Sequence, residues 1–438
     1  MATKKNSSNA PETPGIDDNE EKFLKDPQWV EKALKKATVI ELNKYEEELA
    51  NLLIELAFKN SESNPSLLGH SLAAAFDLFV AAEYYKKITS KGWLYCPTSS
   101  PLLIYPFTNT CTRCILNGEF HFHKANKPGS GTIGGITRKL LGVFLARLFE
   151  RSGRSLTVLR GAEPIDLVVW DNQNDIVLMA EAKAAPLTTL ALAVPCEIQT
   201  ALNDDGEVIN LSHGPLDNSS LEKSEFHLLI PQPEGEKWRL ELISLGVRPS
   251  KQTDFWSYSQ IQRVFSQDEQ MFGRYFQFWQ RAFAAYSRGE WIRGAAPDSV
   301  YWLTNACGQP VPRPVSWPTR NSGEGFESVS DGKSSMGMDR TDDIKKGIYQ
   351  VLKLGASAKP KSKVTIKTAL LSNIHAVRHY DTYLKDLQDI VWTQTSNKAV
   401  SKVGQLPPEQ DLYNLFDGII SFTEIYARDN WIAENFKF

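Results

Sequence analysis

The stretch that decides the fold reads Pro164-Ile165-Asp166-Leu167-Val168-Val169-Trp170, a polar break over 171–175, and then Ile176-Val177-Leu178-Met179-Ala180-Glu181-Ala182-Lys183. Two apolar, β-branched runs around a short segment rich in Asp and Asn predict a β-hairpin. If the runs pair antiparallel about the centre of that segment, Asp166 faces Glu181, with Cβ atoms about 4.5–5.5 Å apart. Lys183 lies two residues further and projects from the same face of its strand. The hairpin is therefore predicted to bring two carboxylates and one amine together at one end.

Two facing carboxylates repel each other unless a cation lies between them. Mg²⁺ is bound in proteins through one or two carboxylates, with water and substrate phosphate completing its shell. A bound Mg²⁺ polarises a phosphoryl oxygen and lowers the pKa of water, and a nearby amine can orient that water. The three side chains therefore predict a phosphodiester-cleaving site, and the alternative interpretation is a surface hairpin with charges at its rim.

Pro164, Asp166, Glu181 and Lys183 resemble the PD-(D/E)XK motif of the restriction-endonuclease-like nucleases, with one extra residue, Ile165, after the proline. The resemblance covers about twenty residues. It implies an α/β fold in which a restriction-endonuclease-like mixed central sheet is flanked by helices. Within it, Asp166 and Glu181 would hold Mg²⁺ and Lys183 would assist the attacking water.

Chain length and texture resemble a type II restriction endonuclease, which implies sequence-specific, Mg²⁺-dependent hydrolysis of double-stranded DNA in a cytoplasmic restriction-modification system. Cutting both strands of a short site is most simply achieved by a homodimer whose twofold axis matches a palindromic target. Two other functions stay open: a structure-specific repair or defence nuclease, and a non-catalytic, zinc-containing DNA-binding protein. Asp331 and Lys333 also imitate the end of the motif and form the second candidate for the catalytic pair.

The segment before the hairpin predicts a helix, because apolar side chains recur at helical spacing over 133–150. In the resembled family, the helix before the catalytic hairpin often offers an acid to the metal site, and Glu150 is the residue placed to do so. The alternative is that Glu150 ends the helix in solvent. Residues 155–160 then predict the first strand of the α/β core.

Cations gather in two further segments that predict contacts with DNA. The loop 121–131 combines lysines, small polar residues and glycines ahead of a helix, where backbone N–H groups favour phosphate, unless it is only a surface loop. The region 326–379 has the strongest local concentration of cations, with Thr341 as a helix N-cap and a second predicted helix carrying Asn373, His375, Arg378 and His379. The residues predicted to contact DNA are Lys124, Lys127, Lys333, Arg340, Lys345 and Lys346.

Three of the five cysteines have a spacing that suggests structural zinc. Cys111 and Cys114 form a CxxC, Cys96 lies upstream, and His121 or His123 can complete a Cys₃His tetrahedron. Serine stands where a second CxxC would place its other cysteine, so buried thiols without metal are the alternative.

Composition and texture set the outer limits. Of 438 residues 42% are hydrophobic and the net charge is −3, which supports sizeable cores and requires any DNA site to depend on local positive charge. We expect a disordered tail over 1–22, a mainly helical N-terminal region over 23–130, a nuclease core over 131–250, and a helical and mixed region over 251–438 that contributes DNA contacts. Stretches 225–230 and 238–243 predict a hairpin at the far side of that core, and 258–290 predicts a helix. The unpaired cysteines fit a reducing compartment, and neither a secretory signal nor a membrane span is expected.

Overall fold

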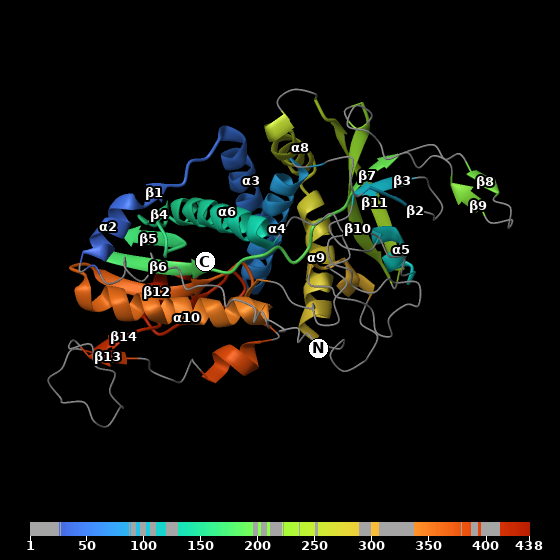
Figure 1. Ribbon diagram of the computed structural model, residues 1–438. Coiled ribbons are helices and arrows are strands. Elements are labelled where there is room, and N and C mark those ends of the chain that lie inside the picture. The colour runs from blue at the N-terminus through green and yellow to red at the C-terminus, as the bar shows by residue number, and fades with distance from the viewer. Residues whose placement is uncertain are drawn as a thin grey trace, which may run out of the picture.

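Figure 1 shows the protein as a computed structural model. It describes residues 26–86 except 27, then 88, 93–96, 102–105, 111–119, 130–195, 200–202, 208–210, 221–249 except 222 and 236, 253–288, 299–305, 337–386 except 378, 393–395 and 412–438. The predicted tail over 1–22 lies outside the described residues.

The main sheet is built around the hairpin that the sequence predicts. Strands β4 (Thr157–Arg160), β5 (Leu167–Asp171) and β6 (Ile176–Ala182) follow one another antiparallel. The polar turn is closed by the Asp171 side chain, which accepts hydrogen bonds from the backbone N–H groups of Gln173 and Asn174 at 3.1 Å each. The predicted first strand and the predicted hairpin are both confirmed.

The other half of the main sheet comes from the C-terminal part of the chain. Strand β12 (Thr365–Leu371) pairs parallel with β6, and β15 (Gly418–Ile420) pairs parallel with β12. An edge strand β16 (Ile425–Ala427) and the short β1 (Thr38–Val39) complete the order β1-β4-β5-β6-β12-β15-β16. The sheet is therefore mixed, and the boundary expected near residue 250 does not separate it from the C-terminal region.

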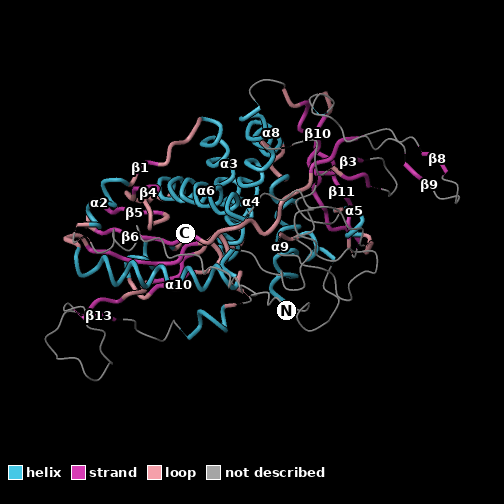
Figure 2. Tube along the Cα trace, viewed as in Figure 1, coloured by secondary structure: helices cyan, strands magenta, loops and turns pink. Residues whose placement is uncertain are grey.

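Helices cover both faces of this sheet, as Figures 1 and 2 show. Helix α6 (Ser130–Arg151) lies on the face where Val169 and Leu178 join the largest apolar cluster. On the other face, Val168 and Met179 pack against α10 (Thr341–Ala358) and α2 (Trp29–Lys36). Strand side chains alternate between the faces, so Glu181 and Lys183 continue the face that carries Met179.

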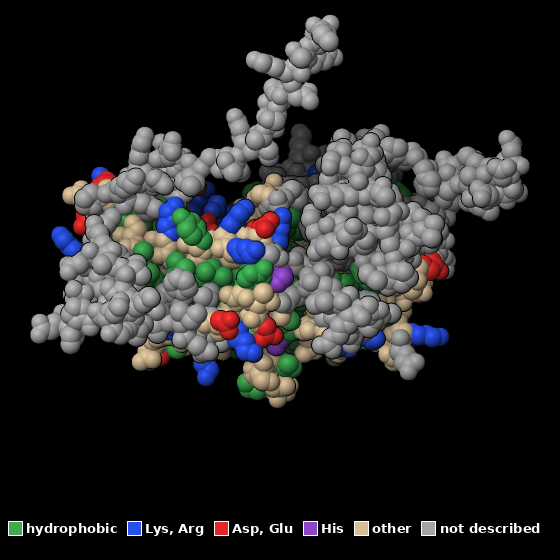
Figure 3. Space-filling model, turned by 60° about the horizontal axis from the view of Figure 1, so that its bottom comes forward, with side chains coloured by type: hydrophobic (Ala, Val, Ile, Leu, Met, Phe, Trp, Pro, Cys, Tyr) green, Lys and Arg blue, Asp and Glu red, His purple; other side chains and the backbone are tan. Residues whose placement is uncertain are grey.

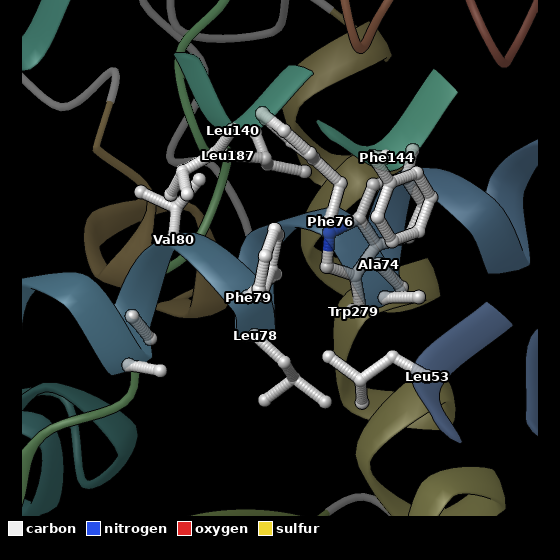
Figure 4. Packing of buried hydrophobic residues seen from close by; sticks show 14 of the residues in the cluster. Leu53, Ala74, Phe76, Leu78, Phe79, Val80, Leu140, Phe144, Leu187 and Trp279 are labelled. Carbon is white, nitrogen blue, oxygen red and sulfur yellow. The ribbon is translucent and has the colours of Figure 1, made fainter. Parts of the chain in front are cut away.

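Helix α4 (Leu68–Tyr85) is the central helix of the protein and is preceded by a 3-10 turn, Pro65–Leu67. Figure 4 shows Phe76 and Phe79 of α4 among Leu53 of α3 (Lys44–Ser61), Phe144 of α6 and Trp279 of α9 (Met271–Arg288). Among the described residues, the segment Pro65–Tyr85 is long and apolar enough to cross a membrane, although the sequence analysis predicts no membrane span. Its most apolar window is 67% buried inside the protein, as expected of a core helix.

A second sheet carries the hairpin that the sequence assigned to the far side of the core. Strands β10 (Glu225–Glu234) and β11 (Lys237–Val247) pair antiparallel, but they belong to a separate five-stranded sheet of order β11-β10-β7-β3-β2. Its other strands are β7 (Leu192–Pro195), β3 (Leu102–Tyr105) and β2 (Leu94–Cys96). The predicted hairpin is therefore confirmed, but it lies in a sheet other than the one that carries β6, because β7 pairs with β10.

The long helical region beyond residue 250 is two helices, α8 (Thr253–Gln267) and α9, which break at residues 268–270. The remaining elements are short: α5 (Thr112–Leu116), α12 (Asn430–Phe436), the paired strands β8 (Thr200–Leu202) and β9 (Val208–Asn210), the paired strands β13 (Thr393–Thr395) and β14 (Leu412–Asn414), 3-10 turns at Ser299–Leu303, Gly337–Asp339 and Lys359–Lys361, and a π-helical turn at Tyr380–Leu384.

Two details of the region after residue 337 differ from the sequence prediction. The N-cap of α10 is Arg340 and Thr341 is its first helical residue. Asn373, His375 and His379 do not lie on a second helix, and Asn373 and His375 are buried just beyond the end of β12. Arg378 lies outside the described residues. Asn373 and His375 therefore belong to the buried packing at the end of β12. They are not exposed on a surface that could contact DNA.

Candidate active site

The register of the hairpin places Asp166 and Glu181 at the same end of the sheet. Leu167 pairs with Ala180, so the next pair outward in the same register is Asp166 and Glu181. The Asp166 carboxylate lies close enough to Glu181 for its charge to raise the pKa of that acid. The predicted meeting of the two acids is confirmed.

Glu181 lies in an environment that disfavours its ionised form. Only 11% of its side chain is exposed, and this burial is the largest cause that raises the pKa of Glu181. The nearby negative charge of Asp166 also raises the pKa and Lys183 lowers it, and the net result is a pKa of about 7. Lys183 donates from Nζ to Glu181 Oε1 at 2.5 Å. A cation bound between Glu181 and Asp166 would neutralise both carboxylates and would therefore favour the ionised form of Glu181.

Among the described residues, two groups donate hydrogen bonds to the Asp166 carboxylate. Its Oδ2 accepts from the backbone N–H of Ala182 at 3.0 Å, which fixes the carboxylate against the end of β6. Its Oδ1 accepts from Arg138 of α6 at 2.5 Å. Sequence reasoning did not identify Arg138, because nothing in the motif specifies which residue of a preceding helix reaches the hairpin. Helical periodicity placed apolar positions but gave no signal for this cation.

The backbone of Lys183 is fixed at the end of β12, and its side chain lies beside helix α10. Its N–H donates to Leu371 O at 2.8 Å, and its carbonyl accepts from Ser372 Oγ at 2.9 Å. A Cβ at Gly347 of α10 would lie 2.8 Å from Leu370 Cδ2 and 3.5 Å from Lys183 Cγ, so glycine lets the helix pack closely against β12 beside this side chain. Gln350, one turn further along α10, donates to Pro164 O at 3.0 Å. The site is thus enclosed by β6, β12 and α10.

A buried polar network lies directly behind this end of β6. Asn373 accepts from the N–H of Ala185 at 3.1 Å and donates to its carbonyl at 2.9 Å. Fully buried Asp77 of α4 accepts from the N–H of Thr188 at 2.9 Å and from Trp279 Nε1 at 2.8 Å. Burial raises the pKa of Asp77 to about 8, despite these hydrogen bonds. The network fixes the chain that follows Lys183 to the central helix.

Glu150 is not part of this constellation. It lies near the other end of α6, twelve residues from Arg138, which corresponds to about 18 Å along a helix. Its side chain is 67% exposed and pairs with Arg147 at 2.8 Å. The prediction that this helix offers an acid to the metal site is wrong at Glu150, because the N-terminal half of α6 approaches the hairpin and presents an arginine.

Three of the residues predicted to contact DNA are described. Lys345 and Lys346 are exposed on α10, directly before Gly347, and Arg340 is exposed at the start of that helix, 3.6 Å from Asp343. Figure 3 turns the underside of the protein forward and shows Lys and Arg side chains near the middle of this face, beside a hollow. Lys124, Lys127 and Lys333 lie outside the described residues, as does Asp331 of the second candidate pair.

The three predicted cysteine ligands come together in the second sheet. The Sγ atoms of Cys96, Cys111 and Cys114 all lie within 4.8 Å of one another, and the three residues are fully buried. The histidines expected to complete the set, His121 and His123, lie outside the described residues. The sequence therefore identified three side chains that do converge.

No family model matches this chain. No curated protein and no solved structure matches it either.

Proposed function

We propose that the protein is a Mg²⁺-dependent endodeoxyribonuclease of the PD-(D/E)XK type. The observation that carries this proposal is the meeting of Asp166 and Glu181 across the hairpin, with the ammonium of Lys183 at 2.5 Å from Glu181. The mixed sheet flanked by helices on both faces supports the same family, since the resemblance implies that architecture.

The donor set fits Mg²⁺. Two carboxylates at a partly exposed edge match the one or two that Mg²⁺ takes while keeping water and substrate phosphate. Asp166 and Glu181 would hold the ion, which would polarise a phosphoryl oxygen and lower the pKa of water. The side chains of Asp166 and Glu181 are 17% and 11% exposed, so both remain reachable from solvent.

The two cations of the site have separate roles in this proposal. Lys183 Nζ lies 2.5 Å from Glu181 Oε1, where it orients the attacking water or neutralises the departing oxygen. Arg138 pairs with Asp166, and 38% of its side chain is exposed, so its guanidinium can exchange this carboxylate for a DNA phosphate. Together they offset the negative charge that the two acids and the phosphate bring to one place.

Double-stranded DNA is the substrate that the surroundings favour. The exposed Lys345 and Lys346 lie on α10 next to Gly347, where an added Cβ would lie 3.5 Å from Lys183 Cγ, so they can bind phosphates near the site. Sequence-specific cutting of both strands, as in a type II restriction enzyme acting as a cytoplasmic homodimer, is the form of activity that the resemblance implies.

A plasmid-cleavage assay tests the proposal. We expect supercoiled plasmid to be cut with Mg²⁺ and to stay intact without divalent cations. Asp166→Asn, Glu181→Gln and Lys183→Met should each lower the rate by at least about a hundredfold, the scale of a lost catalytic group, while retaining DNA binding. Glu150→Gln is the matched control and should cut normally.

The products separate the competing functions. Discrete fragments from a plasmid of known sequence support a site-specific enzyme, whereas cutting confined to branched or damaged DNA supports a repair or defence nuclease. Binding without any cutting supports the non-catalytic zinc-containing alternative. Wild-type cleavage rates in all three site variants would refute the assignment to this hairpin.

A further inference from the structure

The second sheet contains a cluster of thiols that the proposed nuclease chemistry does not use. Cys96 ends strand β2, whereas Cys111 and Cys114 lie at the start of α5 and within it. The Sγ atoms of Cys96 and Cys114 are 3.9 Å apart, and all three Sγ atoms lie within 4.8 Å of one another. The cluster therefore connects two segments that are separate in the sequence.

We propose that Cys96, Cys111 and Cys114 bind a structural zinc ion that anchors α5 to the second sheet. Four ligands at Zn–S distances of about 2.3 Å place neighbouring sulfurs about 3.8 Å apart in a tetrahedron, close to the separation between Cys96 and Cys114. A disulfide is a poorer explanation, because it requires sulfurs at about 2.05 Å and would leave one thiol over.

The local structure explains why a metal would stabilise this region. Helix α5 has five residues, which is too short to be stable by its own hydrogen bonds. The apolar cluster around the cysteines contains Leu102, Ile104, Leu229 and two alanines, so a bound metal would add to the free energy that their burial supplies. Zinc binding supplies folding free energy directly, because the site forms only when both segments meet.

The chemistry of the ligands selects the metal. Thiolates favour zinc among the abundant divalent ions, and Mg²⁺ prefers oxygen ligands. No fourth His, Cys, Asp or Glu joins the cluster in the part of the chain that the structure describes. Three thiolates already carry one more negative charge than the ion neutralises, which favours a neutral nitrogen or water in the remaining position.

Metal analysis of the purified full-length protein tests this proposal. Protein isolated without chelators should contain about one zinc per chain, and Cys96→Ser or Cys114→Ser should lower the content at least fivefold. Ala193→Ser is the matched control, because it places a hydroxyl in the same buried cluster without removing a thiol, and it should retain zinc.

X-ray absorption at the zinc edge of the wild-type protein keeps the test decisive if the serine variants fail to fold. Three or four sulfurs at about 2.3 Å support the site. A metal-free wild-type protein, zinc with fewer than three sulfurs, or zinc retained in folded Cys96→Ser would overturn it. These measurements contain no DNA and no Mg²⁺, so a zinc-loaded protein without nuclease activity would refute only the proposed function.

Discussion

Replacing Glu181 with glutamine should change how stability depends on pH in the absence of Mg²⁺. Burial and the charge of Asp166 raise the pKa of Glu181 from 4.5 to about 7. The folded protein therefore disfavours the ionised form, and this acid lowers stability progressively as the pH rises from about 4.5 through 7. A tenfold change in an acid dissociation constant corresponds to about 1.4 kcal/mol. The raised pKa of Glu181 therefore lowers the free energy of unfolding by about 3 kcal/mol above pH 7.

The comparison of wild type with Glu181→Gln isolates this effect. Between pH 5 and pH 8, the free energy of unfolding of the wild type should fall by about 2.5 kcal/mol more than that of the variant, a difference in Tm on the order of 5 °C. Asp77, whose pKa burial also raises, affects both proteins in the same direction and cancels. Thermal unfolding in Mg²⁺-free buffer without chelator measures the difference and leaves any thiolate-bound zinc in place.

Two further measurements test whether the Glu181 carboxyl causes this difference in pH dependence. Glu150→Gln, at a glutamate whose side chain is 67% exposed, should follow the wild type across the same pH range. Adding Mg²⁺ at pH 8 to about a hundred times its dissociation constant should stabilise the wild type by about 2.7 kcal/mol and the variant much less. Parallel pH curves for wild type and Glu181→Gln would show that this carboxyl is neither desolvated nor adjacent to another acid.

Two further experiments test α10 beside the site, and a third tests a buried ion pair. Gly347→Ala would place a Cβ 2.8 Å from a leucine methyl of β12 and 3.5 Å from Lys183 Cγ. Single-turnover cleavage should therefore fall at least tenfold, while the free energy of unfolding changes by less than about 2 kcal/mol. An unchanged cleavage rate would show that α10 is not part of the site. Neutralising Lys345 and Lys346 should reduce the salt dependence of DNA binding by about 0.9 per lost phosphate contact, and an unaltered slope would exclude this surface. Lys359→Met should destabilise the protein by about 3–5 kcal/mol in denaturant unfolding, because it leaves a buried carboxylate unpaired, and a loss below about 1 kcal/mol would contradict that role.

The sequence predicts the hairpin well because its information is local. Apolar alternation and a short polar turn determine the pairing of β5 with β6, and that register places Asp166 opposite Glu181. The partner on the other side of β6 could not be predicted, since β12 lies far along the chain and parallel pairing leaves no turn signal. The missed Arg138 has the same cause: a cation on one helix pairs with an acid only through tertiary packing.

The second sheet shows where local patterns are insufficient. Alternation identified β10 and β11 as a hairpin but could not indicate that β7 leads the chain away from the main sheet. Glu150 and His375 do not take their predicted roles. The resemblance places an acid on the helix before the hairpin, and residue type places His375 on a DNA-contacting helix, whereas Glu150 is exposed far from the hairpin and His375 is buried behind the sheet.

The parallel pairing of Ala182 with Leu371 has a consequence for synthesis of the chain. A nascent polypeptide that ends before residue 365 lacks the carbonyl that accepts the N–H of Lys183 and the hydroxyl that donates to its carbonyl. Contacts so distant along the chain form late, because closing the intervening loop is entropically costly. The ribosome must therefore release most of the protein before this lysine is held in place, and truncated products would lack the completed centre.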